Sequence, residues 1–368
     1  MHKNILILSS DQTGLGHKSI TEALIEQFNK HEQVNVHIID GYSLSGSIGL
    51  KIGKLYGTIT RASNDLWKLI WDISLKKPDL IIELVENSIL VKLLPKLKQI
   101  NPDAIIVTHP NYNSSVLNIL EHHHIKIPLF SIVADLVSIS PLWSDARARY
   151  TICPTEEAKK MCIDYGVPES RIRVFGFPVR EKFCHSTVST DSIKGYNSGE
   201  PLRCLIMSGG EGSGNMSRIA KILLKNFNCS VKIICGRNKQ LKKRLESTLL
   251  EKYPNNIEIL GFTDNIQQLM LDSDILFARA SPNVMMEAVM CNIPLIITGA
   301  LPGQEEGNPA YAGKYGLGLV CHEVKDIKQI INSLLDNNAE LLHKIKSAQN
   351  KYRNPQSAAN IVEFILNN

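Results

Sequence analysis

The feature that most constrains the fold is a series of short, wholly apolar segments that stops and then starts again. In the first half of the chain these segments alternate with amphipathic segments of helix length. Strands that are apolar on both faces and separated by helices are typical of parallel sheets with helices on both sides. The first series predicts strands at Asn4–Ser10, Val34–Asp40, Ala104–Thr108, Leu129–Ala134, Tyr150–Cys153 and Arg173–Phe175.

A polar, turn-rich stretch from His185 to Pro201 separates this series from the second, which has the same alternation. The second series predicts strands at Arg203–Ser208, Val231–Cys235, Ile257–Leu260, Ile275–Ala278, Leu295–Thr298 and Gly318–Cys321. A chain of 368 residues is long enough for two domains at roughly 150 residues each. We therefore predict an α/β protein with two doubly wound domains that face each other across a cleft, where ligands bind beyond the carboxyl ends of the strands.

The predicted domain bounds follow from this pattern. The N-terminal domain spans 1–185, the linker 186–200 and the C-terminal domain 201–349. The last helix, at about 350–368, is expected to pack back on the N-terminal domain.

Composition indicates an ordinary globular protein, with 43% hydrophobic and 21% charged residues. The eight cysteines form no CxxC pair and lie mostly in apolar runs, which favours buried thiols in a reducing compartment. The chain enters a strand-like run at His2, so no signal peptide is expected, and no apolar stretch approaches the ~18 residues that span a bilayer. We expect a cytoplasmic protein that is soluble or lies on a membrane. A net charge of +5 identifies no partner, and none of nucleic-acid type is expected.

Each half opens with a strand, a glycine-rich turn and a helix. The first turn is Gly14-Leu15-Gly16-His17, and the second runs from Gly209 to Gly214 and includes Gly210, Gly212 and Ser213. Glycines allow backbone N–H groups to approach an anion at a helix N-terminus. A dinucleotide fold is an alternative, with Asp40 placed to bind ribose, but Ser19 stands where the third glycine belongs. A P-loop is excluded because no Gly-Lys-Ser/Thr follows either turn.

A second candidate anion site lies at Ser281-Pro282. This pair is suited to begin a helix, as N-cap and first helical residue, that runs to about Asn292. Asn283 and Glu287 lie four residues apart on one face of that helix. Its N-terminus is expected to hold a diphosphate and Glu287 the ribose hydroxyls. The polar loop from Pro302 to Asn308 is suited to sugar hydroxyls.

Residues 45–77 combine basic and aromatic side chains, including Lys51, Lys54, Arg61, Trp67 and Trp71. In this segment the apolar side chains form one helical face, with the two tryptophans beside it: Leu66, Leu69, Ile70 and Ile73. Such a helix binds anionic membrane surfaces. The alternatives are an amphipathic helix packed on its own domain and a pocket for a soluble hydrophobic acceptor. The run His122-His123-His124 occupies a polar connection, and we expect it to be solvated rather than metal-binding.

A series of short motifs along the chain resembles the motifs of a known family. In order along the chain they are Gly14-Leu15-Gly16-His17, Pro102-Asp103, His109-Pro110, Ala134-Asp135, Trp143, Phe175-Gly176-Phe177-Pro178-Val179-Arg180, Met207–Gly212, Ile234–Lys239, Gly261-Phe262, Glu287-Ala288 and Gly303–Asn308. The chain resembles the monogalactosyldiacylglycerol synthases with the processive diacylglycerol glucosyltransferases, and more distantly MurG. The resemblance implies a GT-B fold of two Rossmann-like domains, inverting hexose transfer from a UDP-sugar, no cofactor or obligatory metal, and a membrane-associated acceptor.

The resemblance also implies roles for individual residues. It places the uracil at Phe262, the ribose at Glu287, and the diphosphate near Arg180 and the loop with Ser213 and Gly214. It places the donor sugar at Gln304 and Glu305. The residues expected to surround the donor also include Gly16, Gly210, Gly212, Ser281, Pro282 and Asn283. The acceptor side is expected at His109, Ser140, Trp143, Trp67 and Trp71.

Inverting transfer needs a base that takes the proton of the acceptor hydroxyl. His17 is the first candidate, because it stands at a helix entrance facing the cleft, where the positive end of the helix keeps an imidazole neutral. Asp135 is the second candidate base, or the group that orients His17 or the acceptor. His109 is expected to serve the acceptor site or the structure.

The chain departs from the family pattern in three places. Ala134 and Ser140 stand where the family has Thr and His, Lys18 where it has Arg, and Ser281-Pro282-Asn283-Val284 where it has Gly-Pro-Gly-Thr. The residues that anchor UDP are retained, so UDP binding is expected to survive these changes. The altered residues cluster on the acceptor side and around the sugar.

Three candidate functions are compatible with these features. The first is transfer of a hexose from UDP-glucose or UDP-galactose to a lipid such as diacylglycerol, on the inner face of a membrane. The second is the same transfer to a non-lipid hydroxyl, and the third is a non-catalytic UDP-sugar-binding protein. A UDP-sugar epimerase is disfavoured, because it needs additional acid/base carboxylates and the sequence offers no convincing set of them.

Overall fold

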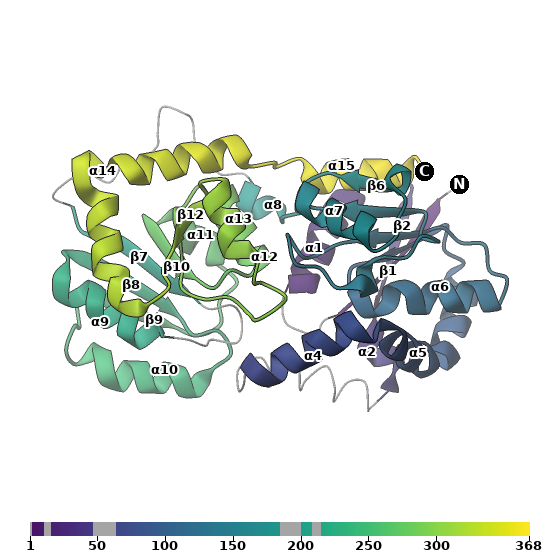
Figure 1. The fold of residues 1–368 in the computed structure, drawn as a ribbon, viewed down its shortest axis with the longest axis horizontal. Helices are drawn as coiled ribbons and strands as arrows, with labels where there is room; N and C mark the ends of the chain where they lie inside the picture. The colour runs from purple at the N-terminus through teal and green to yellow at the C-terminus, as the bar shows by residue number, and fades with distance from the viewer. Residues whose placement is uncertain (1, 11–15, 47–63, 185–199, 208–214) are drawn as a thin grey trace. The chain divides into compact units, whose positions relative to one another are not determined.

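The computed structural model describes residues 2–10, 16–46, 64–184, 200–207 and 215–368. The chain divides into two compact units (Figure 1). Unit 1 comprises Met1–Glu181, Pro302–Gly307 and Asn354–Asn368, and unit 2 comprises Lys182–Leu301 and Asn308–Arg353. The loop Pro302–Gly307 lies inside the predicted C-terminal domain, but the structure groups it with unit 1. The predicted linker, 186–200, lies outside the described residues except for Glu200.

In the described part of unit 1, a six-stranded parallel sheet has the order β2-β1-β3-β4-β5-β6. Each strand lies at its predicted place, with ends that shift by no more than two residues. The strands are β1 Lys3–Ser9, β2 Val34–Asp40, β3 Ala104–Val107, β4 Leu129–Ile132, β5 Tyr150–Cys153 and β6 Ile172–Val174.

Helices cover the sheet of unit 1. Helix α5 (Pro78–Ile100) buries Ile89 and Leu93 in a core with Leu6 and Val107 of the central strands. Helix α1 (Gly16–Phe28) contacts α15 (Ser357–Leu366), the last helix of the chain, which therefore packs on unit 1 as predicted. The other helices of unit 1 are α2 Gly41–Leu44, α4 Asn64–Lys76, η1 Pro110–Tyr112, α6 Asn113–His122, η2 Pro141–Trp143, α7 Glu156–Asp164 and η3 Glu169–Arg171.

Unit 2 repeats the design. Within the described residues, its sheet is also six-stranded and parallel, in the order β12-β11-β10-β7-β8-β9. The strands are β7 Leu202–Met207, β8 Cys229–Ile234, β9 Ile257–Leu260, β10 Ile275–Ala278, β11 Leu295–Ile297 and β12 Gly318–Val320. Both sheets confirm the predicted α/β class.

The helices of unit 2 pack around this sheet (Figure 1). They are α8 Glu181–Cys184, which begins at the boundary, α9 Met216–Asn226, α10 Lys239–Leu245, η5 Glu246–Leu250, α11 Ile266–Leu271, α12 Pro282–Met290, α13 Asn308–Lys314, η6 Val324–Asp326 and α14 Ile327–Tyr352. Helix α14 is broken at Asp336–Ala339, where backbone dihedrals leave the helical region.

Strand order fixes where each unit can bind a ligand. In unit 1 the chain moves outward from β1 to β2 and then crosses to β3 on the other side of β1, so the order reverses between β1 and β3. In unit 2 the reversal lies between β7 and β10. Doubly wound sheets bind ligands at the carboxyl ends of the strands beside such a reversal. These two places are where the candidate site residues must be sought.

Gly318 begins β12 and cannot accept a side chain. A Cβ there meets the carbonyl oxygen of Leu295 at 2.2 Å, and this oxygen belongs to the neighbouring strand β11. We expect Gly318→Ala to lower the free energy of unfolding by about 1–3 kcal/mol, the usual cost of overpacking, measured from urea denaturation midpoints. Gly313→Ala is the matched control, because nothing lies within 4 Å of its Cβ in helix α13. That control should be neutral or stabilising by roughly 0.5–1 kcal/mol; equal losses in both variants would contradict this packing.

Candidate active site

His17 stands at the reversal point of unit 1, in the first turn of α1. Its Nδ1–H donates to the backbone carbonyl oxygen of Thr108, just beyond β3, over 2.6 Å. A carbonyl can only accept, so the proton is on Nδ1 and the lone pair is on Nε2. Thr21, one turn further along α1, supports this arrangement: its hydroxyl lies 2.8 Å from Oγ of Ser9 and 3.0 Å from Oγ1 of Thr108. The ends of β1 and β3 thus hold one tautomer of the imidazole.

Burial lowers the pKa of His17 to about 4, against a smaller opposing effect of the Thr108 hydrogen bond. His109 follows β3, and its ring centroid lies 4.5 Å from that of His17. Burial, with repulsion from His17, holds the pKa of His109 well below its usual value. Both imidazoles are therefore neutral at pH 7, as predicted for His17. The ring of Tyr42 lies edge-on to His109 at 5.8 Å, and burial raises the Tyr42 pKa to about 12.

Asp135 follows β4 and is only 3% exposed. Trp143 Nε1 donates to its Oδ2 over 2.9 Å, and Gln304 Nε2 donates to its Oδ1, also over 2.9 Å. Burial raises the pKa of Asp135 to about 6, the two hydrogen bonds oppose that rise, and the charge of Glu305 adds to it. Asp135 is mainly a carboxylate at pH 7. Because the Trp143 ring also lies 6.3 Å from the His17 ring, the two candidate bases flank one tryptophan.

The hydrogen bond between Trp143 and Asp135 was not predicted, nor was the role of the Thr108 carbonyl. Trp143 follows Asp135 by eight residues, and this spacing belongs to no regular element that brings two side chains together. Gln304 was predicted to contact the donor sugar in the C-terminal domain, but the structure groups it and Glu305 with unit 1, where Gln304 binds Asp135. The donor-contact role of both residues stays a prediction.

Gly303 fixes the loop that carries Gln304. Its φ of +78° is in the left-handed region, and a Cβ there would meet the Trp71 ring at 2.2 Å. Glycine is thus required for both its backbone conformation and its close approach to Trp71. Ser140, another predicted acceptor-side residue, is buried, and its hydroxyl donates to Ser74 of the same helix as Trp71 over 3.3 Å. Helix α4 is therefore tied to the surroundings of Asp135 at two points.

The two tryptophans of α4 lie beside its exposed apolar face, as predicted, and their burial agrees with the alternative of a helix packed on its own domain. Trp67 and Trp71 are buried, at 7% and 8% exposure, along a stripe that ends at Ser74. What remains exposed is the adjacent stripe, which we call the α4 apolar face: Leu66, Leu69, Ile70 and Ile73. Large aromatic rings lose more water-accessible apolar surface on packing than leucine does, so they take the side that faces the domain. The basic residues predicted near Lys51, Lys54 and Arg61 lie outside the described residues.

Two predicted donor residues are described in unit 1. Gly16 is the first residue of α1, beside His17. Arg180 is half-buried, and its Nη1 donates to Glu22 of helix α1 over 3.0 Å. The guanidinium thus shares its charge with a carboxylate one to two turns beyond His17.

In unit 2 most of the described donor candidates gather at α12, next to the reversal point. The helix begins at Pro282 as predicted and ends at Met290, two residues earlier than expected. Ser281 occupies the N-cap position with extended backbone, as predicted, although its side chain makes no capping hydrogen bond. Asn308 Nδ2 donates to the carbonyl oxygen of Ala280 over 2.8 Å and so fixes the approach to the helix. Glu287 is buried within α12, at 7% exposure.

Phe262 follows β9 and is 49% exposed, with the Arg237 guanidinium 5.3 Å from its ring centroid. An exposed ring beside a guanidinium is suited to stack on a flat base. Asn283 lies half-buried in the first turn of α12. The predicted phosphate loop, with Gly210, Gly212, Ser213 and Gly214, lies outside the described residues.

Among the described residues, no group of three or more His, Cys, Asp or Glu side chains is arranged to hold a metal ion. The run His122-His123-His124 is exposed, as predicted, and His122 lies 3.2 Å from Glu86. No helix in the described part of the chain has the length and apolarity to cross a membrane. All eight cysteines are free, and all but Cys184 are buried, as the sequence predicts.

Comparison with known proteins agrees with this arrangement. The family model for monogalactosyldiacylglycerol (MGDG) synthase matches residues 17–179, from His17 to the residue before Arg180. The model for glycosyl transferases group 1 matches residues 215–352. The chain resembles the monogalactosyldiacylglycerol synthases over nearly its whole length. It is a glycosyltransferase with the GT-B fold.

Curated members of the MGDG synthase family match almost the whole chain. MGDG synthase 2 of Arabidopsis thaliana is 27% identical over 380 residues, which cover 99% of this chain and 80% of that protein. The MGDG synthase of Spinacia oleracea is 28% identical, with coverage of 98% and 71%. A probable MGDG synthase 2 of Oryza sativa is 26% identical, with coverage of 99% and 80%. All three are named as chloroplastic proteins.

Solved structures share the fold of this chain. MurG of Acinetobacter baumannii superposes with a TM-score of 0.67 at 15% identity, over the full length of both chains. The UDP-GlcNAc 2-epimerase of Neisseria meningitidis gives 0.65 at 18% identity, also over both full chains. At such low identity these neighbours establish the GT-B architecture and leave the reaction to the site residues and the relatives.

The hydrogen bonds to Asp135 predict the pH dependence of glycosyl transfer. Both roles considered for Asp135, base and orienting group, need the carboxylate, so the rate should fall as pH drops through about 6. His17, with a pKa of about 4, does not titrate in that window. Trp143→Phe and Gln304→Leu each remove a donor that stabilises the carboxylate, so each should move the acid limb to higher pH.

The measurement is the pH profile of acceptor-dependent UDP release. Trp67→Phe is the control, because it changes a buried tryptophan of unit 1 that is not bonded to Asp135. An acid limb that stays in place in Trp143→Phe, or moves to lower pH, would contradict the account.

Proposed function

We propose that this chain is an inverting glycosyltransferase that moves a hexose from UDP-glucose or UDP-galactose to a hydroxyl of a lipid such as diacylglycerol. The names of the relatives support a diacylglycerol acceptor. The observation that carries the proposal is the His17 imidazole, held as one tautomer by Thr108 with its lone pair on Nε2. An acceptor hydroxyl needs such a lone pair to take its proton during attack.

Transfer is then a single displacement. The acceptor oxygen attacks the anomeric carbon while Nε2 of His17 takes the hydroxyl proton, and the bond from that carbon to the phosphate oxygen breaks to release UDP. A base with a pKa of about 4 is fully available at neutral pH, but it holds the transferred proton weakly. The Asp135 carboxylate compensates for the weak basicity of His17. It does so either by accepting a hydrogen bond from the acceptor or by serving as the base itself.

We assign donor binding mainly to unit 2. The first turn of α12, which begins at Pro282, supplies the backbone N–H groups of Asn283 and Val284 for a diphosphate. Glu287 is the proposed partner of the ribose hydroxyls and Phe262 that of the uracil. Arg180 and the loop from Gly209 to Gly214 are proposed to neutralise the departing UDP, and no metal or cofactor is invoked.

We infer that the α4 apolar face meets the membrane that holds the acceptor. Leu69 is 56% exposed and Ile73 40% exposed, and Lys68 and Lys76 on the same helix are exposed as well. Apolar and basic side chains together bind an anionic membrane surface. The reduced cysteines favour a cytoplasmic location on the inner face of that membrane, whereas the curated relatives are chloroplastic. The buried side of the same helix leads through Trp71 to the Gln304 loop.

The His17 assignment is tested by His17→Gln. We expect a loss of ~10²–10⁴-fold in the rate of UDP release with diacylglycerol vesicles, because a positioned base contributes that much. Binding of UDP, measured by calorimetry, should remain. His122→Gln is the matched control, an exposed histidine outside the site, and should retain the full rate. Undiminished activity in His17→Gln would reject His17 as base, and UDP release in no variant would favour a non-catalytic binding protein.

The membrane assignment is tested by sedimentation with vesicles, with and without an anionic phospholipid. The double variant Leu69→Asp with Ile73→Asp should lose binding to anionic vesicles, because it places two negative charges on the α4 apolar face. Leu250→Asp is the control, an exposed leucine of unit 2, and should bind like the parent chain. Failure of the parent chain to bind either vesicle would refute the membrane surface and favour a non-lipid acceptor.

A further inference from the structure

His109 lies against His17, and its own hydrogen bond fixes the opposite tautomer. The side chain caps the short helix η1, because its Nδ1 accepts the backbone N–H of Asn111 over 3.3 Å. A backbone N–H can only donate, so Nδ1 carries the lone pair and the proton of the neutral ring is on Nε2. In His17 the proton is on Nδ1 and the lone pair is on Nε2. The two rings therefore present a hydrogen-bond donor and an acceptor at the same ring position.

Neither Nε2 atom is engaged by another group in the part of the chain that the structure describes. The hydrogen bonds of the two side chains there are made by Nδ1, to the carbonyl oxygen of Thr108 and from the backbone of Asn111. The ring centroids lie 4.5 Å apart, with an interplanar angle of 52°. Rings this close can contact the same small group, which gives a proton to one ring and receives a hydrogen bond from the other.

The His109 ring has little freedom to turn. The ring of Tyr42 lies edge-on to it at 5.8 Å, and the ring of Tyr112 lies 5.3 Å away at an angle of 42°. The hydrogen bond at Nδ1 restricts the ring further, and the residue is only 5% exposed. A donor that is held in place before its ligand arrives loses little freedom on binding.

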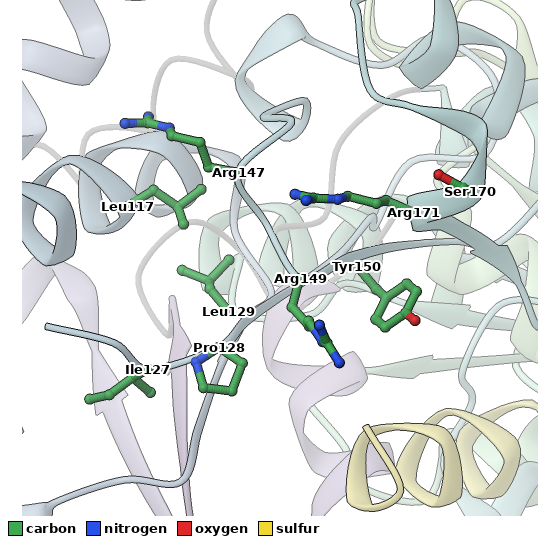
Figure 2. A pocket seen from close by; sticks show the side chains of 9 residues that line it. All are labelled: Leu117, Ile127, Pro128, Leu129, Arg147, Arg149, Tyr150, Ser170 and Arg171. Atoms are coloured by element: carbon green, nitrogen blue, oxygen red, sulfur yellow. The ribbon is translucent and has the colours of Figure 1, made fainter.

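The pair lies at the carboxyl ends of the parallel strands of unit 1. His109 lies two residues beyond Val107, the last residue of β3, and His17 lies in the first turn of α1, across the reversal point. The hollow of about 460 Å³ in Figure 2 lies at the opposite ends, because Leu129 begins β4 and Tyr150 begins β5. That hollow therefore takes no part in the chemistry of the two histidines.

The functional group that satisfies both rings is an un-ionised hydroxyl. It donates its proton to Nε2 of His17 and accepts a hydrogen bond from the Nε2–H of His109. An ionised carboxylate has no proton for His17, and an ammonium group has no lone pair for His109. The two tautomers thus define the chemical class of the group that reacts.

We propose that His109 is a further catalytic residue, which donates a hydrogen bond from Nε2 to the attacking oxygen, and that the two imidazoles together select a hydroxyl nucleophile. This inference rests on the proposed function, with His17 as base. During transfer the acceptor oxygen forms a bond to the anomeric carbon, and its proton passes to Nε2 of His17. The bond from that carbon to the phosphate oxygen breaks, and UDP leaves with the electron pair.

The His109 donor helps this step in two ways. It holds one lone pair of the acceptor oxygen, which leaves the other directed at the anomeric carbon. As the proton leaves, the oxygen gains negative charge, and a fixed N–H stabilises that charge. The donor thereby lowers the demand on His17, which is a weak base.

Two substitutions separate this role from the structural one. His109→Asn keeps an oxygen that can cap η1, since asparagine is among the best N-cap residues, but its amide does not reach the place of Nε2. His109→Gln loses the cap, yet its amide nitrogen reaches that place. We expect kcat for UDP release with dioctanoylglycerol to fall by about 10–100-fold in His109→Asn and to stay within about threefold of the parent chain in His109→Gln. Thermal unfolding midpoints should show the reverse order.

The matched control is His123→Asn, which changes an exposed histidine outside the site and should retain the parent rate. A rate in His109→Asn that equals or exceeds that of His109→Gln would overturn the proposal and leave His109 as a structural cap. If His17→Gln loses the rate while His109→Asn keeps it, this inference alone is refuted. Absence of UDP release from the parent chain refutes the proposed function instead.

A thiol acceptor gives a readout that a change in fold stability does not move. In the thiol analogue of dioctanoylglycerol, sulfur replaces the reacting oxygen and accepts hydrogen bonds only weakly. The parent chain should prefer the hydroxyl acceptor, as judged by kcat/KM. That preference should shrink by on the order of tenfold in His109→Asn, because the donor that recognises oxygen is gone. An unchanged preference would contradict the role of His109.

Discussion

The arrangement of the candidate active site depends on the hydrogen bond from His17 Nδ1 to the carbonyl oxygen of Thr108. It joins the first turn of α1 to the end of β3, across the point where the strand order reverses. One bond thereby fixes the position of the imidazole, its tautomer and the atom that is available to a hydroxyl. Burial keeps this imidazole neutral, and the neighbouring His109 is neutral for the same reason.

The second half of the site is held by partners distant in sequence. Asp135 receives hydrogen bonds from Trp143 and from Gln304, which lies 169 residues away. The Gln304 loop rests on Trp71 because Gly303 has no side chain. Helix α4 therefore faces outward with leucine and isoleucine and inward with the ring that supports the Asp135 environment. The proposed membrane contact and the carboxylate are thus linked by packing within one unit.

The sequence predicts the strands well, because strands buried on both faces leave uninterrupted apolar runs such as Ile5–Leu8. It also predicts the start of α12, since Ser281-Pro282 is a local signal. It does not predict that Gln304 binds Asp135, because pairing across 169 residues leaves no local pattern. The close approach of Trp71 to Gly303 was not predicted for a related reason, because Gly303 lies far along the chain.

The measurement that tests the central claim most directly is analysis of the product. The chain is incubated with diacylglycerol vesicles and with UDP-glucose or UDP-galactose in parallel, and the lipids are examined by mass spectrometry and NMR. The account predicts a hexosyl-diacylglycerol whose anomeric configuration is inverted relative to the donor, formed with one of the two sugars or both. A product with retained configuration, or a sugar found only on a non-lipid acceptor, would contradict it.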